Sequence, residues 1–132
     1  VRKWIANMDN GSVFSIIALC NNEIIGHGSL HFREFGATKH VGRFRIVVMP
    51  EFRNKRLGTW ILLDLIQAAM DRGLKALRTD LVKDLEDAAI EAVKKFDFFQ
   101  RGDLKNYAID PQGNKHDMVI MIKRLHANWT DY

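Results

Sequence analysis

The sequence is poor in cysteine and proline. Cys20 is the single cysteine of these 132 residues, which excludes an internal disulfide and a cysteine-rich zinc module. The two prolines, Pro50 and Pro111, are isolated and mark turns between elements rather than a linker. So little cysteine is typical of a reducing compartment, and we expect a cytoplasmic location.

Long apolar runs and a strong charge imbalance are also missing. The longest apolar runs, residues 15–20 and 61–66, are far shorter than a membrane span, and Asp64 interrupts the second. We therefore expect no membrane partner. The chain has 20 lysines and arginines against 16 aspartates and glutamates, a net charge of +4. That excess is too small to indicate a nucleic-acid partner by itself.

The length and the apolar pattern predict one domain over residues 1–132. With 47% hydrophobic residues, the chain can bury its own core. Alternating apolar residues predict strands, and an apolar period of 3.6 residues predicts helices. The predicted elements are strands at 12–20, 23–34 and 41–48, a helix at 57–72, a strand at 75–82, a helix capped by Asp84, and strands at about 104–109 and 116–124.

This order predicts an α/β fold with a mixed, mostly antiparallel sheet. The strand, helix and strand within residues 41–82 form a βαβ crossover, which requires two parallel strands. The other connections suit antiparallel pairs. In the strand 41–48, alternation places Phe44, Ile46 and Val48 on one face and Arg43, Arg45 and Val47 on the other.

The segment from Arg53 to Thr59 joins a predicted strand to an amphipathic helix. Free N–H groups and the positive end of the helix dipole make such a helix start an anion site. Gly58 lets the backbone approach a ligand closely, and Arg53, Lys55 and Arg56 add positive charge. The pattern favours a phosphate or pyrophosphate ligand. The alternative is a solvated basic turn that binds nothing.

Two segments resemble the GCN5-related N-acetyltransferase (GNAT) superfamily. The segment VMPEFRNKRLGT, residues 48–59, is similar to its acetyl-CoA motif, which follows a V-x-P turn and reads Gln/Arg-x-x-Gly-x-Gly/Ala. Arg53 and Gly58 match, and Arg56 replaces the first glycine. The segment 86–98 is similar to the helix motif N-x-x-A-I-x-x-Y-x-K-x-G-F. The matches there are Ala89, Ile90, Lys95 and Phe98, and the departures are Glu86, Val93 and Asp97.

The resemblance spans about residues 12–124 and implies both fold and chemistry. It implies a GNAT-like sheet in which the two parallel strands splay apart, with helices on both faces. It implies acetyl-CoA as co-substrate, no metal, and direct acetyl transfer to a primary amine. The pantetheine arm would lie along the third strand, and a backbone N–H near Val48 would stabilise the oxyanion. The residues that it assigns to coenzyme A are Ile46, Val47, Val48, Arg53, Asn54, Lys55, Arg56, Leu57, Gly58, Thr59, Glu86 and Ala89.

The resemblance leaves the general base and the general acid open. Many family members use a glutamate of the third strand as the base, and this strand has none. Glu34 and His40, which flank the 35–40 loop, are the nearest candidates, and an exposed loop residue is the favoured explanation of each. The family's usual general acid is a tyrosine, and Val93 replaces it in this sequence. Tyr107 is a candidate substitute, with a half-buried strand residue as the alternative.

Other functions and partners stay open. A catalytically weak sensor or scaffold that binds coenzyme A would fit the departure at Val93. A nucleic-acid-binding module would fit the basic residues at 43, 45 and 53–56, but no base-reading motif accompanies them. The acceptor, a small molecule or a protein, is not identified by the sequence, although Arg43 and Arg45 would suit an acidic one. A homodimer is compatible with the sequence.

The family usually has a strand and two helices before the hairpin predicted at 12–34. Only eleven residues precede that hairpin here, so we expect the usual strand and helices to be absent from this stretch. Within the hairpin, His27 and His31 lie four residues apart on one strand. That spacing separates them by about 13 Å, too far to chelate one metal ion.

Overall fold

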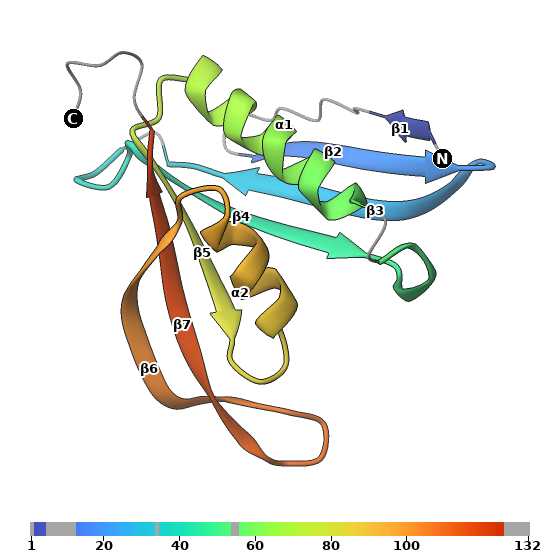
Figure 1. Ribbon diagram of the computed structural model, residues 1–132. Coiled ribbons are helices and arrows are strands. Elements are labelled where there is room, and N and C mark those ends of the chain that lie inside the picture. The colour runs from blue at the N-terminus through green and yellow to red at the C-terminus, as the bar shows by residue number, and fades with distance from the viewer. Residues whose placement is uncertain (1, 5–12, 34, 54–55, 126–132) are drawn as a thin grey trace. The chain divides into compact units, whose positions relative to one another are not determined.

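The computed structural model describes residues 2–4, 13–33, 35–53 and 56–125 (Figure 1). The chain forms two compact units. The first comprises Val1–Leu77 with Leu125–Tyr132, and the second comprises Arg78–Arg124. In the part of the chain that the structure describes, no helix has the length and apolar character needed to cross a membrane.

The first unit contains an antiparallel sheet with the strand order β1, β2, β3, β4. Its strands are β1 (Arg2–Trp4), β2 (Val13–Cys20), β3 (Glu23–His31) and β4 (Val41–Val48). The last three confirm the predicted strands, although β3 ends earlier than expected. We expected no strand ahead of β2, and β1 differs from that expectation. Its three residues are too few to show an alternating pattern, and its pairing with β2 defines it.

The connections within this sheet follow local backbone chemistry. Asn21 and Asn22 join β2 to β3 with positive φ angles of 51° and 67°, as a tight hairpin requires. After β4, Met49 precedes a single 3₁₀ turn, η1 (Pro50–Phe52), because proline cannot continue the ladder. This turn was not predicted from the sequence. It leads directly to the segment from Arg53 to Thr59, which we call the basic loop.

Helix α1 (Leu57–Asp71) packs against β2, β3 and β4 and confirms the predicted helix. It lies close to β3 because Gly26 and Gly28 carry no side chains there. A Cβ atom at Gly26 would stand 3.1 Å from Ile61 Cδ1, and one at Gly28 would overlap Ile61 Cγ2. Ile61 and Leu65 are fully buried at this contact. Each such side chain contributes about 1.5–3 kcal/mol to stability.

The register between β3 and β4 decides which side chains face α1. Gly28 lies opposite Ile46, so residue 46 shares the face that α1 covers. The predicted division of β4 is therefore confirmed. The other face carries Arg43, Arg45 and Val47, and all three side chains are exposed.

The return from α1 begins β5. Gly73, two residues beyond the end of α1, has a left-handed φ of 74°, as is common after a helix. The N–H groups of Lys75 and Ala76 then donate to the carbonyl oxygen of His40, at 2.8 and 3.3 Å. Strand β5 (Ala76–Val82) thus begins beside the start of β4, which is where a parallel crossover has to return.

The second unit contains β5, β7 and β6 in that order, together with α2. Helix α2 spans Asp87–Lys94, β6 spans Phe99–Ile109, and β7 spans Lys115–Arg124. Strands β6 and β7 pair antiparallel, as predicted. β6 begins at Phe99, earlier than the predicted start at about residue 104. The prediction missed residues 99–103 because register shifts after Gln100 and Leu104 interrupt the alternating pattern of the strand.

The prediction that Asp84 caps α2 is wrong. The N-cap residue is Glu86, and Asp84 has a left-handed φ of 74° in the preceding turn. The N–H of Asp84 donates to Asp87 Oδ1 at 2.8 Å, and the N–H of Val82 donates to Glu86 Oε1 at 2.9 Å. The carboxylates therefore stabilise the turn before α2 by accepting backbone N–H groups upstream of the helix.

Candidate functional site

Backbone hydrogen bonds fix the end of β4, just before the basic residues 53–59. The N–H of Met49 donates to Ile25 O at 2.9 Å, which keeps the chain beside β3 for one residue beyond β4. Successive N–H groups of a strand point to opposite edges. The N–H of Val48 therefore points to the edge of β4 away from β3. This is the direction that the predicted oxyanion donor needs.

Arg53 ties the loop to the strand. Its Nε donates to Val48 O at 3.2 Å, while its own backbone N–H donates to Pro50 O at 3.3 Å. The side chain is exposed, and its terminal guanidinium nitrogens have no hydrogen-bond partner among the described residues. One end of the guanidinium is thus fixed, and the other is open to a ligand.

Arg56 adopts the backbone conformation that glycine favours. It is the N-cap residue of α1, with φ 63° and ψ 10°, and no side chain caps the helix. A left-handed conformation costs a residue with a side chain about 1–2 kcal/mol. The first glycine of the acetyl-CoA motif falls at this position. The sequence departs from the motif here, and the backbone adopts a conformation that a glycine would reach at no cost.

The first turn of α1 presents open donors. Its first helical hydrogen bond runs from Trp60 N to Arg56 O at 3.1 Å. The N–H groups of Leu57, Gly58 and Thr59 precede that bond and have no acceptor among the described residues. A Cβ atom at Gly58 would meet only Val48 Cγ2, at 3.9 Å. Packing within the described chain therefore does not require a glycine at 58.

The other residues assigned to coenzyme A are placed less directly. Asn54 and Lys55 lie outside the described residues. Glu86 and Ala89 belong to the second unit, and the Glu86 carboxylate already accepts the N–H of Val82. The structure brings together the loop residues 53 and 56–59 with the end of β4. The contacts of Glu86 and Ala89 with coenzyme A stay predictions.

The structure does not bring His40 to the loop. His40 precedes β4, whereas the loop follows it, so the two are separated by about 25 Å along the strand. The His40 side chain is exposed, and its carbonyl oxygen accepts two N–H groups from the start of β5. This geometry explains His40 as a turn residue. Glu34, the other candidate base, lies outside the described residues.

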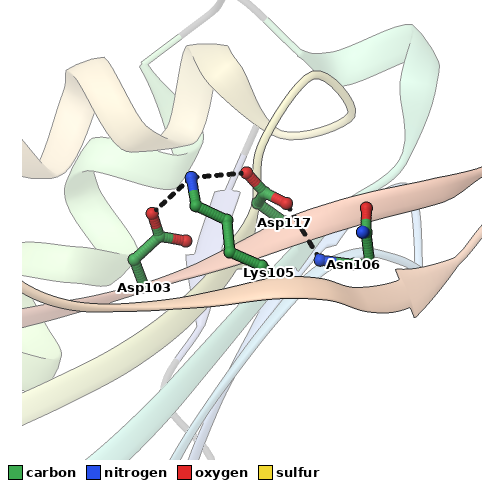
Figure 2. Close-up of polar contacts among 4 residues, drawn as sticks. All are labelled: Asp103, Lys105, Asn106 and Asp117. Atoms are coloured by element: carbon green, nitrogen blue, oxygen red, sulfur yellow. Dashed lines mark hydrogen bonds and ion pairs between the residues drawn. The ribbon is translucent and has the colours of Figure 1, made fainter.

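Tyr107 lies in the bulge of β6 between Leu104 and Ala108. Asp117 stabilises this bulge through Lys105 and Asn106 (Figure 2). Asp117 Oδ1 accepts the N–H of Asn106 at 2.9 Å, and Oδ2 accepts Lys105 Nζ at 3.2 Å. Lys105 also pairs with Asp103 at 2.9 Å. The N–H of Asn106 and then the Lys105 ammonium hold the pKa of the Asp117 carboxyl below its usual value. Tyr107 itself is 65% exposed, and its role as a general acid stays a prediction.

His27 is a further candidate site residue, which the sequence pattern presents only as a possible metal ligand. In the structure His27 is exposed on β3 and lies opposite Val47 of β4, on the face away from α1. Directly opposite residues have Cβ atoms about 4.5–5.5 Å apart. His27 is therefore the imidazole nearest in register to the end of β4. The signal that identifies it is the pairing register, which a local sequence pattern does not contain. Among the described residues, no three His, Cys, Asp or Glu side chains are grouped so that they could hold a metal ion.

Comparison with known proteins agrees with this geometry. Residues 1–98 match the model of the Acetyltransferase (GNAT) family. The chain belongs to the GNAT family. A relative, the L-amino acid N-acetyltransferase AaaT of Escherichia coli K12, is 24% identical over 102 residues, which are 76% of this chain and 62% of the relative. This GNAT chain thus spans less than two thirds of that relative's length.

Solved structures share the GNAT fold. An N-acetyltransferase from Staphylococcus aureus Mu50 superimposes with a TM-score of 0.79 at 22% identity, covering 86% of this chain and 68% of that one. The yncA protein of Salmonella typhimurium, determined with its cofactor acetyl-CoA, has a TM-score of 0.79 at 19% identity, covering 89% and 67%. The prediction of a mixed, mostly antiparallel α/β fold of GNAT type is therefore confirmed.

Proposed function

We propose that this protein transfers the acetyl group of acetyl-CoA to a primary amine. The observation that carries the proposal is the segment from β4 to α1. There Arg53 and Arg56 precede three open N–H groups, and a Cβ atom at Gly58 would meet only Val48 Cγ2, at 3.9 Å. Such donors at a helix start bind phosphate oxygens. Membership of the GNAT family supports acetyl-CoA as the anion's source, as do the relative named for N-acetyl transfer and the neighbour solved with acetyl-CoA.

In this proposal the pyrophosphate lies on the amides of residues 57–59, between the guanidinium groups of Arg53 and Arg56. The pantetheine arm lies along the backbone of Ile46, Val47 and Val48. This arrangement would bring the thioester to the part of β4 from which the Val48 N–H points away from β3. Asn54 and Lys55 are proposed to add contacts to the phosphates.

The chemistry needs a free amine, an oxyanion donor and a leaving thiolate. The amine nitrogen attacks the thioester carbonyl, a C–N bond forms, and the Val48 N–H stabilises the negative oxygen. His27 accepts the proton that the amine loses. The C–S bond then breaks, and the coenzyme A thiolate leaves and is protonated from solvent or by Tyr107. His27 enters this scheme because of its position opposite Val47 and its exposed ring.

The test is acetyl transfer by the full chain. The protein is incubated with acetyl-CoA and a panel of primary amines, thiol release is followed continuously, and products are identified by mass spectrometry. We expect amine-dependent thiol release with an N-acetylated product. His27→Gln should lower kcat by about 100-fold and leave acetyl-CoA affinity unchanged, as loss of a general base does. Failure to bind acetyl-CoA would contradict the proposal.

A second function is favoured by one observation. Val93, which replaces the family's tyrosine, is 6% exposed in α2 and has no proton to donate. A domain that binds coenzyme A as a sensor, with little transfer, would fit that side chain. Saturable acetyl-CoA binding without an acetylated product from any amine would support the sensor over the enzyme.

A further inference from the structure

The sheet face opposite α1 carries a cluster of polar side chains on β3 and β4. We name it the polar face, and it comprises Ser29, His31, Arg43 and Arg45. Residues of β3 that face the helix are Gly26 and Gly28, so their odd-numbered neighbours point to the opposite side. In register, His31 lies opposite Arg43 and Ser29 lies opposite Arg45.

The polar face is positively charged. Both guanidinium groups are exposed, and neither has a hydrogen bond or an ion pair with any described residue. Ser29 is 8% exposed and lies 3.1 Å from His31 Nε2 through its Oγ. The next residues in these rows, on β2, are Val13 and Ser15, so neither β2 nor β3 places a carboxylate in the rows of the arginines.

Such a face suits an acidic ligand. Arginine presents a planar fork of donors that matches carboxylate and phosphate oxygens. Arg43 and Arg45 alternate on one strand, about 7 Å apart, so both can reach one anionic group. Arg43 and Arg45 bind no described side chain, so no contact within the described residues explains why two arginines lie side by side on this face.

The two arginines of the polar face lie on β4, the strand that also carries part of the proposed acetyl-CoA site. Arg45 lies three residues before Val48, about 10 Å along β4, and its side chain can cover much of that distance. An amine held at the thioester would therefore have its remaining atoms within reach of Arg45. The two arginines lie on the face that carries His27, the proposed base.

We propose that the acceptor is a small primary amine that also carries a carboxylate or a phosphate, and that Arg43 and Arg45 bind this acidic group. The inference rests on the proposed acetyl transfer and names the class of its acceptor. Because the acidic group keeps its charge throughout the reaction, its contact should stabilise the bound substrate and the transition state equally. Loss of the contact should therefore appear in KM rather than in kcat.

The test pairs acidic amines with neutral ones of the same length. Glycine, β-alanine and 4-aminobutyrate are each compared with their amides, and phosphoethanolamine is compared with ethanolamine. We expect kcat/KM to be about tenfold higher or more for at least one acidic amine than for its neutral partner. The pair that shows the preference distinguishes a carboxylate from a phosphate.

The variants show whether the preference comes from the polar face. Arg45→Gln should raise KM for the acidic amine about tenfold with kcat within about twofold, and leave the neutral partner unaffected. Arg45→Glu should reverse the preference toward a diamine, a gain that misfolding cannot imitate. Arg101→Gln, at an exposed arginine of β6 outside the polar face, is the matched control for lost charge.

Outcomes separate this inference from the proposed function. Equal kcat/KM for acidic and neutral amines, no transfer to any acidic amine, or an unchanged preference in Arg45→Gln would overturn the inference. Each of these results is compatible with acetyl transfer to another amine. Failure of the unmodified protein to bind acetyl-CoA in calorimetry would instead overturn the proposed function.

Discussion

A carboxylate at position 58 should separate acetyl-CoA binding from fold stability. In Gly58→Asp, the new side chain enters space where a Cβ atom meets only Val48 Cγ2, at 3.9 Å. An aspartate in the first turn of a helix interacts favourably with the helix dipole, by about 0.3–1 kcal/mol. Replacing a helical glycine also adds stability. The variant should therefore be at least as stable as the parent protein.

The same carboxylate would lie beside the pyrophosphate. Two unit charges about 5 Å apart repel by about 3 kcal/mol at an effective dielectric constant of about 20. Because the loop is partly exposed, we expect about half of that repulsion, or about 1.5 kcal/mol. This corresponds to a Kd for acetyl-CoA at least about tenfold higher, before any steric cost is added.

Calorimetric titration with acetyl-CoA measures the change, and thermal unfolding checks the fold. Gly58→Ala is the matched control, because it removes the same glycine without adding charge, and the GNAT motif accepts alanine at this position. We expect Gly58→Ala to bind within about threefold of the parent and Gly58→Asp at least about tenfold more weakly. Unchanged affinity in Gly58→Asp would refute the placement of the pyrophosphate at this helix start.

Three further predictions follow from the geometry. Arg56→Gly should remove the cost of the left-handed backbone at this position and raise the free energy of unfolding by up to about 1 kcal/mol, as chemical denaturation would measure. Loss of one exposed cation should weaken acetyl-CoA binding about threefold, as calorimetry would measure. Gly28→Val should destabilise the fold by about 1–3 kcal/mol, because the side chain would overlap Ile61, and urea unfolding tests this. Strong acid should weaken the turn between β6 and β7. His116, 2.8 Å away, and two backbone N–H groups hold the pKa of the Asp110 carboxyl below its usual value. Its stabilisation is present above the unfolded-state pKa and is lost as pH falls through the lowered folded-state pKa, so Tm should fall less steeply on acidification in Asp110→Asn.

The core of the fold was predictable because its signals are local. The alternation of residues 41–48 and the apolar period of 57–72 each appear within one element, and both are confirmed. Strand β1 was missed because three residues show no period. The start of β6 was missed because its bulges break the alternation.

The candidate site was only partly predictable. Residues 53–59 are contiguous, so the sequence alone shows that their charges and their glycine belong to one site. At Arg56 the sequence shows a departure from the motif, and only the φ of 63° shows that the backbone has the left-handed conformation that glycine favours. His27 could not be found locally, because its position opposite Val47 depends on pairing between two strands. The general base was therefore the least predictable part of the site.

The proposed acetyl transfer depends most directly on whether this chain binds acetyl-CoA. Thermal unfolding of the 132-residue protein in increasing acetyl-CoA measures this without any assumption about the acceptor. At 100 times Kd, one-site binding adds about 2.7 kcal/mol to stability, which corresponds to a rise in Tm of about 10 °C for a domain of this size. The account predicts a saturable rise of that order, reduced in Gly58→Asp and preserved in Gly58→Ala. A Tm that does not change with acetyl-CoA at millimolar concentration would contradict it.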